Sequence, residues 1–131
     1  MTVGGWEPVS RTFLNEEVLN RLLRAASAVD SDDFGLAPKE TAKYSALMQM
    51  ELSVWRPLIE MLNDEELIRL LKFFTLAEQR LKGWHAGANS PVIALAKLLR
   101  ERSAYPQTLT QWIRENSDNR FIPHGSLMDR L

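Results

Sequence analysis

The 131-residue chain contains no cysteine. It therefore forms no disulfide, offers no thiolate to a metal and has no cysteine nucleophile. It also lacks a stretch of about 18 uncharged apolar residues, the length that crosses a bilayer, and residues 1–17 contain no apolar run of signal-peptide length. From these absences we expect a cytoplasmic protein that does not enter a membrane.

Motifs typical of common enzyme classes are missing as well. The chain has no glycine-rich phosphate loop, no H-E-x-x-H and no G-x-S-x-G. The two histidines, His85 and His124, are not spaced as ligands of one metal. Residues 30–35 begin like a calcium loop, but Phe34 and Thr41 occupy positions five and twelve, where that loop needs oxygen ligands. The sequence therefore predicts no metal, no cofactor and no catalytic residue, and it favours a non-enzymatic function.

Charge of one sign is not in excess. Lysine and arginine number 16 against 17 for aspartate and glutamate, which gives a net charge of −1. Strong nucleic-acid binders usually carry a more basic domain. The content of 45% hydrophobic and 25% charged residues is typical of a globular protein, and the length suits one core. We expect a single all-helical domain over residues 1–131.

The strongest structural signal is an amphipathic helix over residues 64–82. Asn63 is a good N-cap, Glu66 completes a capping box, and Gly83 suits the end of a helix. The apolar residues cover an arc of roughly 160°, which needs neighbours on more than one side. They are Leu67, Leu70, Leu71, Phe73, Phe74, Ala77 and Leu81. The pattern predicts a compact bundle of about five helices around this central helix.

Other segments are expected to cover the central helix. A first helix begins at about residue 12 or 15. A long second helix begins at Pro38, and Pro57 is expected to kink or break it near Trp55. Glu78 falls close to the apolar arc of the central helix and is expected to reach solvent or pair with a basic residue.

The two ends of the chain are expected to be largely irregular. Glycine and proline make residues 1–11 a poor helix, although Trp6 is expected to anchor them on the core. Residues 120–131 contain Pro123 and Gly125 and are predicted to be an extended tail. This tail is also rich in apolar residues, so we expect it to pack on this protein or on a partner.

These observations favour a protein-protein interaction or regulatory module, which binds an unidentified partner or self-associates. The best candidate surface combines a glycine-containing loop at residues 84–89 with the last helix and the tail. Tryptophan and arginine are the residue types that recur at binding hot spots. The predicted binding residues are Trp84, His85, Asn89, Trp112, Arg114, Arg120 and Phe121.

The alternative is a DNA-binding regulator. Two helices are predicted at residues 91–102 and 108–116, the second with a capping box of Thr108 and Gln111. Such a pair can place its second helix in a major groove. Gln111, Arg114 and Asn116 would then lie at the surface of that helix, and Arg100, Arg102 and Arg120 near phosphates. Against this alternative stand the length of the connection between the helices and the weakly basic charge of the chain.

Overall fold

The computed structural model describes residues 14–28 and 34–125, and every regular element within these ranges is helical. The all-α prediction is thereby confirmed for this part of the chain. Trp6, residues 29–33 of the acidic turn and residues 126–131 of the tail lie outside the described residues. The α-helices are α2 (Glu16–Ala26), α3 (Pro38–Tyr44), α4 (Leu52–Ile59), α5 (Asp64–Arg80), α6 (Pro91–Glu101) and α7 (Leu109–Asn116), and the 3-10 helices are η2 (Ser45–Gln49) and η3 (Gly87–Asn89).

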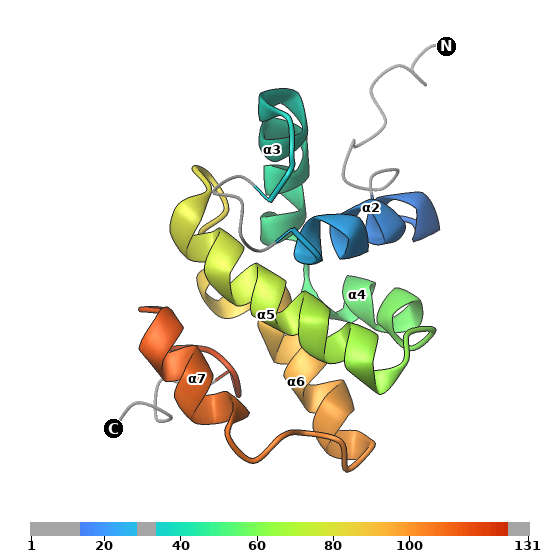
Figure 1. Cartoon of the computed structure of the whole chain (residues 1–131), viewed down its shortest axis with the longest axis vertical. Coiled ribbons are helices and arrows are strands. Elements are labelled where there is room, and N and C mark those ends of the chain that lie inside the picture. The colour runs from blue at the N-terminus through green and yellow to red at the C-terminus, as the bar shows by residue number, and fades with distance from the viewer. Residues whose placement is uncertain (1–13, 29–33, 126–131) are drawn as a thin grey trace.

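Helix α5 is central, as the sequence predicts. It packs against α2, α6 and α7 and crosses the middle of the molecule (Figure 1). Its capping box forms: the amide of Glu66 donates to Asn63 Oδ1 at 2.8 Å, and the amide of Asn63 donates to Glu66 Oε1 at 3.0 Å. The helix ends at Arg80, because Leu81 has an extended backbone, and Gly83 then adopts a φ of 84° that favours glycine.

The predicted long second helix is in fact two helices, and its break lies earlier than expected. Helix α3 continues into η2, and the chain then turns at Met50 and Glu51 before α4 begins. Pro57 lies inside α4 and does not end it. A proline there removes the bond to the carbonyl of Ser53, and both residues are exposed, so water can replace that bond. Proline is therefore tolerated at this position.

The core contains a cluster of large aromatic rings. Phe73 on α5 meets Phe34 edge-on at a centroid distance of 5.0 Å and Trp84 at 5.9 Å. Phe74 packs in the same way on Trp55 of α4, at 5.3 Å. All five rings are buried. Edge-to-face pairs add to the free energy gained by burying aromatic surface, so α5 is stabilised from several sides, as its wide apolar arc predicts.

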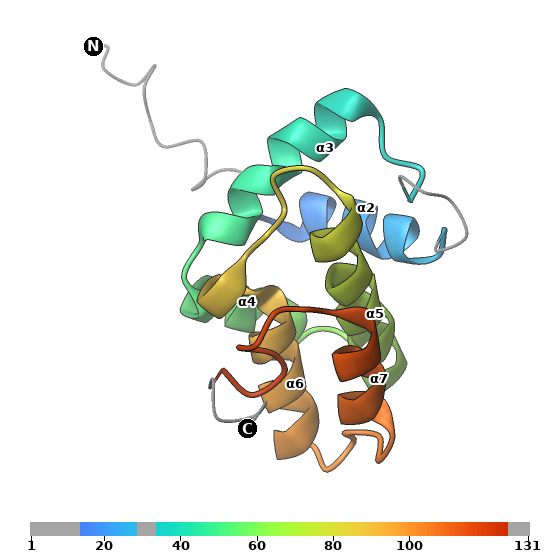
Figure 2. The same ribbon diagram turned by 90° about the vertical axis from the view of Figure 1, so that its left-hand side faces the viewer.

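The C-terminal segment, defined here as residues 117–125, packs on the helices of its own chain. Its residues 120–125 form turns, so the prediction of an extended tail is wrong for this part. Ile122 is buried, and the amide of Gly125 donates to the carbonyl of Phe121. A Cβ placed on Gly125 would lie 3.4 Å from Ile93 Cγ2, so the segment ends directly against α6 (Figure 2).

Candidate functional site

Trp84 belongs to the core and cannot contribute to a binding surface. Its side chain is completely buried, and its ring packs on Phe73 and Phe74. Its indole Nε1 donates to the carbonyl of Thr41 at 2.9 Å. The aromatic ring therefore ties the end of α5 to α3, and this corrects the placement of Trp84 among the binding residues.

The loop at residues 84–89 and the C-terminal segment lie next to each other. The side-chain Nδ2 of Asn119 donates to the carbonyl of Gly87 at 3.0 Å. His85 and Asn89 are exposed in the loop, Arg120 is exposed in the segment, and Phe121 is half-buried. The structure therefore brings together two of the regions from which the predicted surface was assembled.

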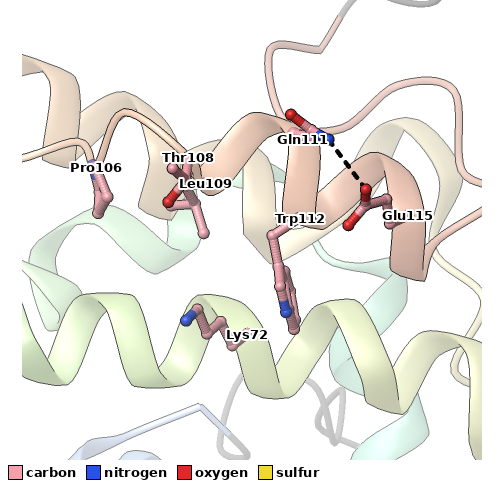
Figure 3. Close-up of a pocket in the computed structure, with 7 residues that line it drawn as sticks. All are labelled: Lys72, Pro106, Thr108, Leu109, Gln111, Trp112 and Glu115. Carbon is pink, nitrogen blue, oxygen red and sulfur yellow. Dashed lines mark hydrogen bonds between the residues drawn. The ribbon is translucent and has the colours of Figure 1, made fainter.

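Trp112 and Arg114 lie on α7, beside two shallow hollows between α5 and α7. In the first, of about 340 Å³, the half-buried ring of Trp112 reaches toward α5, and the Lys72 ammonium lies 5.3 Å from its centroid (Figure 3). Arg114 lines the second, which holds about 360 Å³ and is mostly polar. The predicted capping box of α7 does not form: Thr108 makes no side-chain cap bond, and Gln111 donates to Glu115 at 3.1 Å. Both hollows are lined by Glu115, so α7 presents both signs of charge.

Glu78 is buried, although we expected it to reach solvent or pair with a basic residue. Only 4% of it is exposed, and its carboxylate accepts from the hydroxyl of Ser90 and from Asn119 Nδ2 at 3.5 Å. Burial raises the pKa of Glu78 to about 7, and the bonds from Ser90, Asn119 and the amide of Ala86 oppose that shift. A carboxyl group inside a protein is costly to ionise because it loses its hydration. The sequence gives no signal that would single out Asn119.

The sequence analysis missed an apolar surface on α4. Val54 is 41% exposed and Met61, just beyond α4, is 55% exposed. Pro57 is exposed between them. Their spacing of three and four residues places all three on one side of the helix, opposite the buried Trp55 and Ile59. The sequence contains this spacing, but the same helix also has apolar residues on its buried side, so the pattern alone does not show which of them are exposed.

A groove of about 710 Å³ adjoins this stripe, between α4, α6 and the C-terminal segment. Its floor and walls are mainly apolar, and Arg56, Lys97 and His124 carry its polar groups. We call the stripe and the groove together the α4 face. It is formed by Leu52, Ser53, Val54, Arg56, Pro57, Met61, Ile93, Ala94, Lys97, His124 and Gly125.

Ion pairs fix the geometry of the α4 face. Arg56 bonds Glu60 at 2.7 Å on its own helix and Glu101 of α6 at 2.6 Å. Hydrogen bonds to these two carboxylates raise the pKa of Arg56, and the same contact lowers the pKa of Glu101. His124 lies 2.6 Å from Arg100 through its Nδ1. A guanidinium has only donors, so Nδ1 of His124 accepts here.

Within residues 14–28 and 34–125, no helix is both long enough and apolar enough to span a bilayer. The same ranges contain no group of three or more histidine, aspartate or glutamate side chains that could hold a metal. No protein-family model, curated protein or solved structure matches the chain.

Proposed function

We propose that this chain is a non-catalytic protein-binding module and that its partner, another protein or a second copy of the chain, contacts the α4 face. One observation carries the proposal. Among the described residues, the large hydrophobic side chains that are exposed are Val54, on α4, and Met61, just beyond the C-terminal end of the same helix. A cytoplasmic location, favoured by the sequence, belongs to the same proposal.

The physical argument concerns the cost of apolar surface in water. Burying such surface gains roughly 25 cal/mol per Å², and contiguous apolar patches with a polar rim mark interaction sites. Here the stripe shares Pro57 with a groove that is lined by the apolar Ile93 and Ala94 and by the charged Arg56 and Lys97. An apolar centre with arginine beside it is a common composition of binding hot spots.

The predicted residues on α7 are a second, smaller candidate surface. Trp112 is half-buried, with its ring beside Lys72. Arg114 and Glu115, which follow on the same helix, are both exposed. Tryptophan and arginine suit an interface, but the hollows beside them hold about half the volume of the groove at α4. We therefore place the principal contact at α4.

The DNA-binding alternative has weaker support. Seven residues, 102–108, connect α6 to α7, whereas a helix-turn-helix uses three or four. Most of α6 is buried, and Glu115 and Asp118 place negative charge next to Arg114. DNA binding predicts retention on DNA that weakens steeply between 50 mM and 200 mM salt, and the present proposal predicts no retention at either concentration.

Capture from an extract of the native host tests the proposal. Immobilised wild-type chain is compared with Met61→Asp, which places a charge in the α4 face, and with Asn20→Asp, which adds the same charge at an exposed position of α2. We expect Met61→Asp to lose the captured protein and Asn20→Asp to keep it. Sedimentation of the isolated chain over a range of concentrations shows whether the chain self-associates. It thereby distinguishes a second copy of the chain from a different protein as the partner. Equal capture by both variants would contradict the assignment to α4.

A further inference from the structure

A buried polar cluster joins three parts of the chain that are distant in sequence. Glu78 of α5 accepts from Ser90, the N-cap of α6, and from Asn119 of the C-terminal segment. The amide group of Asn119 also donates to the carbonyl of Gly87 in the preceding loop. One carboxylate therefore holds the start of α6 and the C-terminal segment in place.

The C-terminal segment depends on Asn119 for its shape. The amide of Asn119 donates to Ser117 Oγ at 3.0 Å, and Asn119 Oδ1 accepts from the amide of Phe121 at 2.9 Å. Five and six residues after Asn119, His124 and Gly125 line the groove of the α4 face. If the hydrogen bonds of Asn119 break, the residues that form one wall of the groove are therefore free to move with it.

We propose that Glu78 is a proton-dependent latch: its protonated form keeps the C-terminal segment closed on α5 and α6, and its ionised form releases the segment and opens a wall of the α4 groove. The regulatory part of this inference rests on the proposed function of the α4 face. The latch itself is a property of the free chain.

The electrostatic surroundings of Glu78 give the direction of the effect. The titratable groups on the elements around it are exposed: Arg80 and Lys82 at the end of α5, His85 in the loop, Lys97, Arg100 and Glu101 on α6, Arg114 and Glu115 on α7, and Asp118 and Arg120 in the segment. None of them is a cause of the shift that raises the pKa of Glu78 to about 7. Among the described residues, no cation stabilises the ionised form of Glu78 in the closed state, so this form is stabilised by hydration when the segment opens.

His124 would act in the opposite sense. Its Nδ1 accepts from Arg100, so protonation there would remove this contact and loosen the segment at low pH. Weaker protection of the segment at high pH would therefore be attributed to Glu78 and not to His124. The pKa of Glu78 is about 7 in the closed state and has an ordinary value of 4.5 for an exposed carboxyl. The difference between these two values sets how much ionisation shifts the equilibrium toward the open state.

Amide hydrogen exchange of the full free chain tests the latch. Protection factors, corrected for intrinsic exchange, are measured at pH 6 and pH 8 for Asn119 and Phe121, with the core amide of Leu71 as a reference for global unfolding. We expect protection of the two segment amides to fall by about tenfold between these pH values. Their protection should also stay below that of Leu71 at both pH values, because the segment opens without global unfolding. In Glu78→Gln the fall should disappear, whereas Glu65→Gln, an exposed acid on the same helix, should behave as the wild type.

Asn119→Ala provides a second variant in which the carboxylate is retained and the connection is lost. Its segment amides should be weakly protected at both pH values. The latch would be overturned by a fall in protection that persists in Glu78→Gln, by protection of Phe121 in the wild type that does not change with pH, or by protection of Phe121 as high as that of Leu71. Because no partner is present in this experiment, such a result would leave the assignment of binding to the α4 face to be judged by its own test.

Discussion

The hydroxyl of Ser90 donates to the carboxylate of Glu78 and accepts from the amide of Val92 at 3.2 Å. The same side chain therefore caps α6 and satisfies a buried acid on α5. The contact therefore joins α5 and α6, which form the most extensive helix pair of the described chain.

Stability should fall as pH rises through the range in which Glu78 titrates. Its pKa is raised from 4.5 to about 7, so the folded chain holds a proton that the unfolded chain releases. The free energy of unfolding should therefore decrease between pH 4.5 and pH 7, by about 2 to 3 kcal/mol, and level off above pH 7. Urea unfolding at pH 5 and pH 8 measures this change, and Glu78→Gln should remove most of it.

Glu40 should act at the acidic end of the pH scale. Hydrogen bonds from Arg21 and from the amide of Ala37 lower the pKa of Glu40 to about 2. Its contribution to stability is present above pH 4.5 and should be lost as pH falls toward 2. In Glu40→Gln, the free energy of unfolding should depend less on pH below pH 4.5, and its dependence on pH above 4.5 should be unchanged. If this variant lost stability in acid as steeply as the wild type, the role of the Arg21 pair would be contradicted.

The centre of α5 should be intolerant of cavities. Phe74 and Leu70 are completely buried, so substitution of either by alanine should cost about 2 to 5 kcal/mol through lost burial and an unfilled space. Thermal unfolding measures the loss. Variants that melt within one or two degrees of the wild type would show that α5 is not the helix around which the core is built.

The two buried tryptophans should respond differently to replacement by phenylalanine. Trp84 donates its indole hydrogen to the carbonyl of Thr41, whereas the buried Nε1 of Trp55 has no acceptor among the described residues. Trp84→Phe should therefore cost about 1 to 2 kcal/mol more than Trp55→Phe, since only the first change breaks a hydrogen bond. Chemical denaturation of the two variants gives the comparison. Equal losses would show that the Thr41 contact contributes nothing net.

Much of the fold follows from local sequence signals. The capping box of Asn63 and Glu66 and the apolar arc of α5 predict a central helix, and both are present. Ser90 and Pro91 likewise mark the start of α6, where the Ser90 hydroxyl accepts from Val92. These signals are readable because each depends on residues within one or two helical turns.

The second helix shows where local reasoning fails. Pro57 predicts a break near Trp55, but a proline inside a helix removes one hydrogen bond and crowds one carbonyl, and this can be accommodated without ending the helix. At Ser53 that carbonyl belongs to an exposed residue, so α4 continues through Pro57. The actual break, at Met50 and Glu51, carries no proline or glycine to announce it.

The candidate site was harder to predict than the fold. Trp84 has the composition of a hot-spot residue, and only tertiary packing shows that it is buried. Glu78 and Asn119 are 41 residues apart, and their contact depends on how the C-terminal segment returns to α5. The exposed stripe of Val54 and Met61 becomes visible only once the opposite side of α4 is seen to be covered. Long-range contacts of this kind leave no periodic signal in a single sequence.

Whether the α4 face binds a protein partner is decided by the Kd of the captured partner, or of the self-association, for the wild type, Met61→Asp and Asn20→Asp, measured beside the melting temperature of each. We predict that Met61→Asp weakens binding by tenfold or more, about 1.4 kcal/mol. Asn20→Asp should stay within about twofold, and both variants should melt as the wild type does. Unchanged affinity in a folded Met61→Asp variant would contradict binding at the α4 face.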